Sequence, residues 1–157
     1  MNWSRRQTLQ TAGGLGLHGA LAAIGLVPAA ALAQGQAFDH AVFQARTMAD
    51  ALKALGAGAP AESRDVVISA PDIAENGAVV PVGIRSSIPN TEFMALLVDR
   101  NPNALAGAYR ILEGADADVN MRIKMGQSSD VVAIVRADGK YYMAKKEIKV
   151  TLGGCGG

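Results

Sequence analysis

The spacing of apolar residues changes once along the chain, and the change separates an N-terminal helix from a run of strands. Within residues 39–55, apolar side chains recur every three or four positions, which is the spacing of one helix face. Gly56 and Gly58 end this pattern, and Pro60 disfavours its resumption. The pattern therefore predicts one helix over residues 39–55 and a loop over residues 56–64.

From residue 65 onward, apolar and β-branched residues come in short runs or alternate with polar ones. Residues 119–125 alternate without a break, which is typical of a strand with one buried face. Asp138-Gly139 separates two further runs and is a common two-residue turn of a β-hairpin. Pro81 interrupts another run, which indicates a strand edge or a bulge. The strand-like runs are residues 65–70, 78–88, 93–98, 108–112, 119–125, 131–136 and 141–151.

The connections between these strands are too short for the crossovers that parallel neighbours need. The pattern therefore predicts a mostly β protein, an immunoglobulin-like antiparallel β-sandwich preceded by one α-helix.

The first 33 residues have the features of an export signal. Arg5 and Arg6 are adjacent, no charged residue follows before Asp39, and the sequence Ala-Leu-Ala ends at residue 33. Adjacent arginines before a weakly apolar segment are typical of twin-arginine signals, and small residues suit a signal peptidase. We expect cleavage of residues 1–33 and a periplasmic domain over residues 34–152 with no stable membrane association. The alternative is an uncleaved membrane anchor.

Composition and charge exclude several functions. The chain carries 15 basic and 14 acidic residues, so charge provides no basis for binding nucleic acid. A single cysteine excludes an intramolecular disulfide and any metal site built from several cysteines. In an oxidising periplasm, we expect this solitary thiol to react with a group outside the chain.

The cysteine lies in a tail of glycines at the end of the chain. Residues 153–157 are Gly153, Gly154, Cys155, Gly156 and Gly157. Glycines contribute no core and carry a large backbone entropy, so we expect these residues to form a flexible swinging arm. The arm would carry the sulfur roughly 10 Å beyond the last strand and into a deep active site. Cys155 is then a point of covalent attachment rather than a catalytic group.

Two other groups of residues could carry chemistry, but each has a simpler structural explanation. Pairing of His40 with Cys155 would indicate a thiol enzyme, but His40 begins the predicted helix, where exposure is usual. Met121, Met125 and Met143 are soft ligands of the kind that copper takes, but Met121 and Met125 share the inward face of a strand. We therefore expect core packing, no resident metal and no cofactor.

Charged residues gather in two further segments. Residues 71–77 hold two carboxylates among turn-forming residues, which indicates a solvated loop, with contact to a partner as the alternative. Lys145, Lys146 and Lys149 form a basic cluster on the last predicted strand. A solvated strand face or a protected edge explains them, and the alternatives are a docking patch or attraction of small anions.

Three segments carry a family resemblance. Residues 149–157 (KVTLGGCGG) form a highly specific ending, to which residues 71–78 (PDIAENGA) and 122–125 (RIKM) add. With the twin-arginine leader, they resemble SoxY, the sulfur-carrying subunit of the bacterial thiosulfate-oxidation (Sox) system. The resemblance covers essentially the whole chain. It implies an immunoglobulin-like sandwich that holds thiosulfate-derived intermediates on Cys155, and a carrier rather than an enzyme.

The same resemblance implies partners. The carrier would form a heterodimer with SoxZ, and the folded pair would be exported on this leader. The cytochrome SoxAX would join thiosulfate to the thiol, the dimanganese hydrolase SoxB would release sulfate, and the molybdenum enzyme SoxCD would, where present, oxidise the remaining sulfane sulfur. Small sulfur anions are the cargo.

Three other functions remain open from the residues alone. The terminal Gly156-Gly157 suits a ubiquitin-like sulfur carrier that is activated by ATP, although export removes the protein from cytosolic ATP. A binding or structural sandwich whose thiol links two chains by a disulfide is a second alternative. The third is a thiol enzyme such as a peroxidase, which would need an activating base beside a fixed cysteine.

Overall fold

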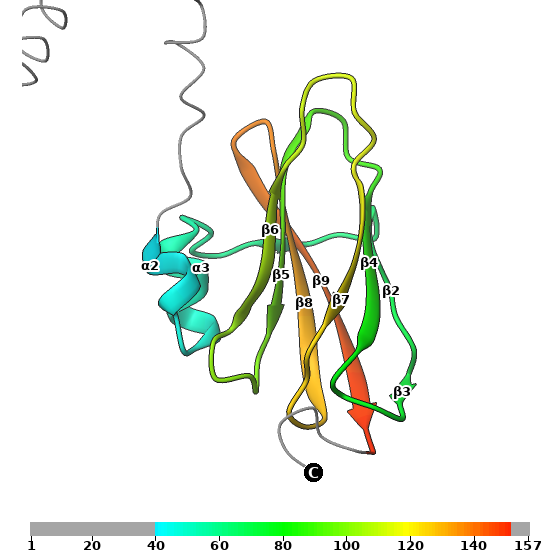
Figure 1. Ribbon diagram of the computed structural model, residues 1–157. Coiled ribbons are helices and arrows are strands. Elements are labelled where there is room, and N and C mark those ends of the chain that lie inside the picture. The colour runs from blue at the N-terminus through cyan, green and yellow to red at the C-terminus, as the bar shows by residue number, and fades with distance from the viewer. Residues whose placement is uncertain (1–39, 152–157) are drawn as a thin grey trace, which may run out of the picture. The chain divides into compact units, whose positions relative to one another are not determined.

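Two stacked β-sheets and a pair of short helices make up the part of the chain that the computed structural model describes, residues 40–151 (Figure 1). The helices are α2 (His40–Gln44) and α3 (Met48–Ala54). The larger sheet contains, in spatial order, β1 (Ala61–Glu62), β9 (Lys140–Val150), β8 (Ser129–Ala137), β5 (Thr91–Val98) and β6 (Leu105–Arg110), and β3 (Ile73–Ala74) also pairs with β9. The smaller sheet contains β2 (Val66–Ser69), β4 (Val80–Ser86) and β7 (Asp118–Ile123). The predicted β-sandwich is confirmed, whereas the leader and the glycine arm lie outside the described residues.

The prediction of one helix over residues 39–55 is wrong, because the chain forms two helices with a break before Met48. Thr47 has an extended backbone (φ −117°, ψ 154°), and its hydroxyl accepts a hydrogen bond from the amide of Asp50 at 3.1 Å. This is an N-cap, which starts a new helix after the bend. Apolar residues keep the same spacing through the break, so periodicity alone did not reveal it.

The middle of the larger sheet is buried on both faces. One face of β5 packs against the smaller sheet through Met94, Leu96 and Val98. Its other face, including Ala95 and Leu97, packs with Val42 and Ala51 of the helices and with Ala45 between them. Alternate residues of a strand point to opposite faces, so the uninterrupted apolar run that the sequence shows at residues 93–98 serves two cores.

The seven predicted strands are present, and all pairings among them are antiparallel. The hairpin is confirmed as well: Ala137 pairs with Lys140, and both turn residues have positive φ, 49° at Asp138 and 71° at Gly139. Two short strands were not predicted. β1 lies in the expected loop 56–64, and β3 lies in the expected loop 71–77; each pairs with β9 in parallel.

Pro81 occupies a local edge, as the sequence indicated. It pairs with Arg122 of β7, whereas β2 extends along β4 only as far as Gly83. β4 therefore has a neighbour on one side only at this position, where a missing amide proton is tolerated. Within residues 40–151, no helix has the length and apolar character needed to cross a membrane.

Candidate functional site

The site that the sequence identifies lies beyond the described residues, but the structure defines where the arm begins. Cys155, Gly153, Gly154, Gly156 and Gly157 are outside residues 40–151, so their predicted flexibility and role stay predictions. The last described residue is Thr151, at the end of β9 and four residues before the cysteine. The immediate surroundings of Thr151 therefore form the base of the arm.

One side of the arm base is held by the segment that follows β2. The amide of Lys149 donates to the carbonyl of Asp72 at 2.9 Å, and the amide of Thr151 donates to the carbonyl of Ala74 at 3.1 Å. The Thr151 hydroxyl adds a third bond, at 3.0 Å, to the carbonyl of Glu75. These bonds place β3 beside the last residues of β9, with Ile73 opposite Lys149.

The opposite side is held by β8 and the residue before it. Ser129 of β8 pairs with Ile148, and the amide of Val150 donates to the hydroxyl of Ser128 at 2.9 Å. No pattern in the sequence points to Ser128, because a lone serine before a strand gives no local signal of such a contact. The backbone is thus bonded on both sides up to Val150 and on one side at Thr151, the last described residue.

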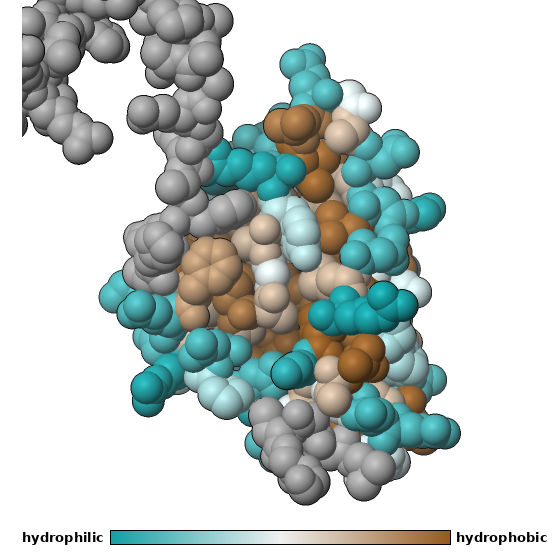
Figure 2. Space-filling view, viewed as in Figure 1, coloured by the Kyte–Doolittle hydropathy of each residue, from teal (hydrophilic) through white to brown (hydrophobic). Residues whose placement is uncertain are grey.

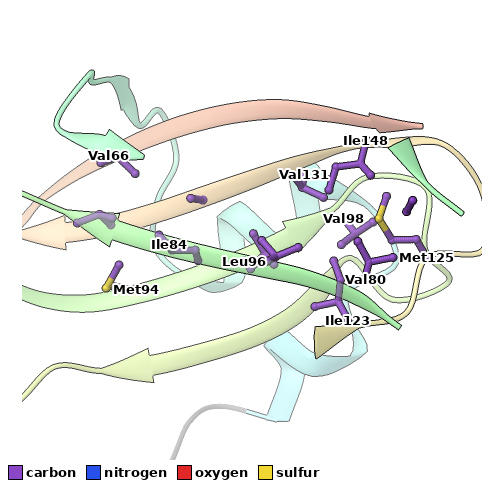
Figure 3. Close-up of a cluster of buried hydrophobic side chains, with 14 residues drawn as sticks. Val66, Val80, Ile84, Met94, Leu96, Val98, Ile123, Met125, Val131 and Ile148 are labelled. Carbon is purple, nitrogen blue, oxygen red and sulfur yellow. The ribbon is translucent and has the colours of Figure 1, made fainter. Parts of the chain in front are cut away.

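The arm base rests on a closely packed part of the core. Figure 3 shows Ile148 close to Val98, Met125 and Val80, near the end of β9. All four side chains are fully buried. The amide of Met125 also donates to the carbonyl of Gly77 at 2.7 Å, which fastens the segment between β3 and β4 to the end of β7. The last residues of β9 therefore belong to a closely packed end of the sandwich.

The two carboxylates of residues 71–77 are exposed, as expected for a solvated loop, but the segment is more than a connection. Asp72 is 90% exposed and forms an ion pair with Lys146, with 3.0 Å between the ammonium nitrogen and the carboxylate. Lys146 also donates to the carbonyl of Ala70. The segment includes β3, and its backbone secures the end of β9.

The three lysines of β9 do not form one patch. Lys146 shares its face with Ile148, in the core between the sheets, whereas Lys145 and Lys149 point to the other face. Lys145 forms an ion pair with Asp130 at 3.0 Å. That hydrogen bond, with the charge of the carboxylate, raises the pKa of Lys145. The prediction of a basic cluster is therefore wrong, because neighbouring residues of a strand alternate in direction.

The other sequence candidates show no site chemistry among residues 40–151. Met125 is fully buried in the core between the sheets, Met121 packs against that core, and Met143 packs against the core under the helices. The core packing predicted for them is confirmed. No three His, Cys, Asp or Glu residues of the described region are placed so that they could hold a metal ion. The backbone of His40 begins α2, but Cys155 lies outside the described residues, so their pairing is not tested.

Two surface hollows are lined by residues without a thiol or an imidazole. One, at the end of the sandwich farthest from the arm, includes Glu113, Asp116 and Asp138. The other lies over the smaller sheet and includes Asn120 and Arg122. In the first hollow the hydroxyl of Ser86 is hydrogen-bonded to the hydroxyl of Thr91 at 2.8 Å rather than to a carboxylate that could act as its base.

Comparison with known proteins identifies the family. The model of the sulfur oxidation protein SoxY matches residues 51–155, which include Cys155. The chain belongs to the SoxY family. A solved structure of the sulfur carrier protein SoxY from Chlorobium limicola f thiosulfatophilum is 35% identical, with a TM-score of 0.62, and the match covers 69% of this chain and 95% of that one.

Other comparisons add little to the SoxY assignment. A superoxide reductase (neelaredoxin) from Ignicoccus hospitalis is 22% identical over 54% of this chain and 78% of its own, with a TM-score of 0.49. No curated protein matches the chain. The predicted resemblance to SoxY is confirmed, and the chain is a sulfur carrier protein of sulfur oxidation.

Proposed function

We propose that this SoxY-family chain holds thiosulfate-derived sulfur covalently on Cys155 while separate enzymes oxidise and hydrolyse it. The observation that carries the proposal is the position of the chain's single cysteine, four residues after the hydrogen-bonded end of β9. A fixed base followed by glycines gives the sulfur a short reach without a packed environment of its own. The thiol is thus suited to enter the active site of another protein.

Loading is an oxidation. The thiolate of Cys155 and the outer sulfur of thiosulfate form a sulfur–sulfur bond, and two electrons pass to the haems of a c-type cytochrome such as SoxAX. The thiol proton goes to solvent. The product carries a terminal sulfonate on a sulfur chain attached to Cys155.

Release is a hydrolysis. One water attacks the terminal sulfonate, sulfate leaves, and a persulfide stays on Cys155; a dimanganese hydrolase such as SoxB would catalyse this step. Where SoxCD is present, it oxidises the remaining sulfane sulfur to a sulfonate with oxygen atoms from water, and the electrons pass to the acceptor of that enzyme while the protons go to solvent. A second hydrolysis then releases sulfate and frees the thiol. The carrier itself supplies the attachment point and needs no cofactor.

The setting of this cycle is proposed from the leader. Arg5 and Arg6 direct export of a folded chain to the periplasm, together with a SoxZ partner that has no signal of its own. The cleaved product, residues 34–157, would then work as a SoxY–SoxZ heterodimer.

The test is intact-protein mass spectrometry of the mature chain after exposure to thiosulfate and a periplasmic extract of a thiosulfate-oxidising bacterium. We expect discrete mass additions that a thiol reductant removes and that Cys155→Ser abolishes. An unchanged mass under conditions that load a known carrier would contradict the proposal.

Two controls separate this function from the alternatives. Removal of Gly156 and Gly157 would abolish a ubiquitin-like activation by ATP, which Cys155→Ser would spare; we expect the opposite dependence for loading. If a disulfide between two chains were the function, reduction would destroy activity, whereas a carrier needs its thiol free. Turnover of a substrate by the purified chain alone would instead indicate a thiol enzyme.

A further inference from the structure

The strand that leads to the arm extends beyond its partner strand on one side. β8 begins at Ser129, which pairs with Ile148 of β9. Residues 149–151 (the overhang) therefore have no residue of β8 beside them. On that side the described chain supplies one hydrogen bond to their backbone, from the amide of Val150 to the hydroxyl of Ser128 at 2.9 Å. The overhang is thus held less firmly on this side than the rest of β9.

The other side of the overhang is paired with β3, a strand of only two residues. The amide of Lys149 donates to the carbonyl of Asp72, and the amide of Thr151 donates to the carbonyl of Ala74. The Thr151 hydroxyl also donates to the carbonyl of Glu75. Lys149 and Thr151 are exposed, and Figure 2 shows hydrophilic side chains at this end of the sandwich. Water can therefore replace these bonds, and each adds only modestly to stability.

Burial changes at Ile148, directly before the overhang. Its side chain is fully buried and lies close to Val98 in the core between the sheets (Figure 3). Val150 is half-buried at the margin of the same core, and Lys149 and Thr151 are exposed. Folded proteins open locally where few apolar contacts and exposed backbone bonds hold a segment. Ile148 is therefore the boundary at which such an opening stops.

The segment opposite the overhang is fastened by other contacts. Ala74 is buried in the core between the sheets, and the carbonyl of Gly77 accepts a hydrogen bond from the amide of Met125 at 2.7 Å. Asp72 forms its ion pair with Lys146, which lies before the overhang in β9. The overhang can therefore leave while β3 and the residues after it keep their places.

We propose that the overhang detaches from β3 and from Ser128 as one unit and adds its length to the arm. The inference rests on the proposed function. Counted from Thr151, a fully extended chain carries Cys155 at most about 14 Å, whereas counted from Ile148 it carries the same thiol about 24 Å. The carrier then has a short reach with the overhang paired and a long reach with it released. Enzymes whose catalytic groups lie at different depths are thereby served by one arm.

Amide hydrogen exchange of the full mature chain at low urea concentrations tests the detachment. The amides of residues 149–151 should share one protection factor, at least about tenfold below that of amides in the middle of β5, which has a partner strand on both sides. Their exchange should hardly depend on urea, because release of three residues exposes little surface, whereas exchange through global unfolding rises steeply with urea.

Two results of this measurement would overturn the proposal. Steep urea dependence at the three overhang amides would mean that they open only when the whole molecule unfolds. The same urea-insensitive opening at the amide of Met125, which is bonded to Gly77, would mean that the segment after β3 opens together with the overhang.

Ser128→Ala tests whether the overhang moves as a unit, because the hydroxyl of Ser128 bonds to Val150 alone among the three residues. In a concerted opening, the loss of this bond accelerates exchange at Lys149 and Thr151 as well, although their amides are bonded to β3 on the other side. We expect about fivefold faster exchange at all three amides, still insensitive to urea. Acceleration confined to Val150 would show independent fraying and would overturn the proposal.

A loading assay tests whether release of the overhang extends the reach. Full mature chains with their SoxZ partner are loaded by a purified c-type cytochrome enzyme that attaches thiosulfate, and adducts are counted by intact mass. Deletion of Gly153 should lower kcat/KM at least about tenfold. Ser128→Ala combined with Thr151→Val should shrink this defect by at least about threefold, because a larger released population restores the reach. Ser87→Ala, at an exposed position near the far end of the sandwich, is the matched control and should leave the defect unchanged.

The outcomes separate this inference from the function on which it rests. If the wild type is loaded and deletion of Gly153 costs the same with and without the anchors of the overhang, the overhang lends no length to the arm; the inference is then wrong and the carrier role stands. If the wild type is not loaded by an enzyme that loads a known carrier, the proposed function is wrong, and the exchange measurements still decide whether the overhang detaches.

Discussion

The hydroxyl of Thr151 donates a hydrogen bond to the backbone carbonyl of Glu75, 3.0 Å away, directly after the end of β9. The two residues are separated by 76 positions in the sequence. The bond fastens the residue that follows β9 to the segment after β3, and it thus belongs to the arm base.

Thr151→Val removes this bond while preserving the shape of the side chain. The bond is exposed, so we expect a loss of at most about 1 kcal/mol in the free energy of unfolding. Amide hydrogen exchange should accelerate at Thr151 and Lys149, because the end of β9 loses one of its anchors. Thr151→Ser keeps the hydroxyl and should retain the slow exchange; fast exchange in both variants would mean that the methyl group, not the bond, secures the strand.

Ser128→Ala tests the anchor on the other side of β9. The amide of Val150 would lose its acceptor, and the partly buried bond predicts a cost of about 1 kcal/mol in urea denaturation. Exchange of the Val150 amide should accelerate. Ser87→Ala, at an exposed position near the far end of the sandwich, is the matched control and should change neither quantity. Unchanged exchange at Val150 in Ser128→Ala would contradict the proposed anchor.

Much of the fold follows from local patterns. The turn at Asp138-Gly139 was predictable because few residue pairs adopt positive φ at two successive positions. The strands from residue 65 onward were predictable because one or both of their faces are buried. The break before Met48 was missed, since the cap at Thr47 interrupts the helix without interrupting the apolar spacing.

Some residues of the candidate site could be predicted from the sequence and others could not. Cys155 was recognisable because a solitary cysteine among glycines is a compositional signal. The anchors of the arm base were not, since the hydroxyl of Ser128 and the carbonyls of Ala74 and Glu75 meet Val150 and Thr151 only in the folded chain. The lysines of β9 were misread as a cluster because residues adjacent in sequence point to opposite faces of a strand.

Gly83→Ala tests a close approach in the smaller sheet. A β-carbon at Gly83 would lie 2.6 Å from the side-chain oxygen of Asn120. The amide nitrogen of the same side chain donates a hydrogen bond to Asp118 at 3.1 Å. We expect the Asn120 side chain to rotate and lose that bond, with a cost of roughly 1 kcal/mol in the free energy of unfolding. In an Asn120→Ala background the obstacle is absent.

The sign of the effect should then reverse. Alanine is favoured over glycine within a strand by roughly 0.5–1 kcal/mol, so Gly83→Ala should stabilise the Asn120→Ala protein. A thermal or urea double-mutant cycle measures the coupling directly. Equal destabilisation in both backgrounds would mean that the glycine is required by the backbone and not by Asn120.

Shortening the arm should slow loading, whereas lengthening it should have little effect. Deletion of Gly153 shortens the reach of Cys155 by about 3.5 Å, and the bulk of the sandwich limits how closely its end can approach an enzyme whose catalytic group is recessed. We therefore expect kcat/KM for loading to fall by at least about tenfold, the loss that a few ångströms of misplacement cause at a reacting atom. Insertion of one glycine after Gly153 leaves the cysteine able to reach and lowers only its effective concentration, a change of less than about twofold.

Deletion of Gly157 is the control for this series, because it removes one glycine without changing the distance from Thr151 to the thiol. Loading of that variant should match the wild type. Reaction with a small thiol reagent should be equal for all four chains, since it requires no approach of the sandwich to an enzyme. If deletion and insertion at Gly153 slowed loading equally, the arm base would not be in contact with the enzyme when the thiol reacts, and the steric limit assigned to this end of the sandwich would be wrong.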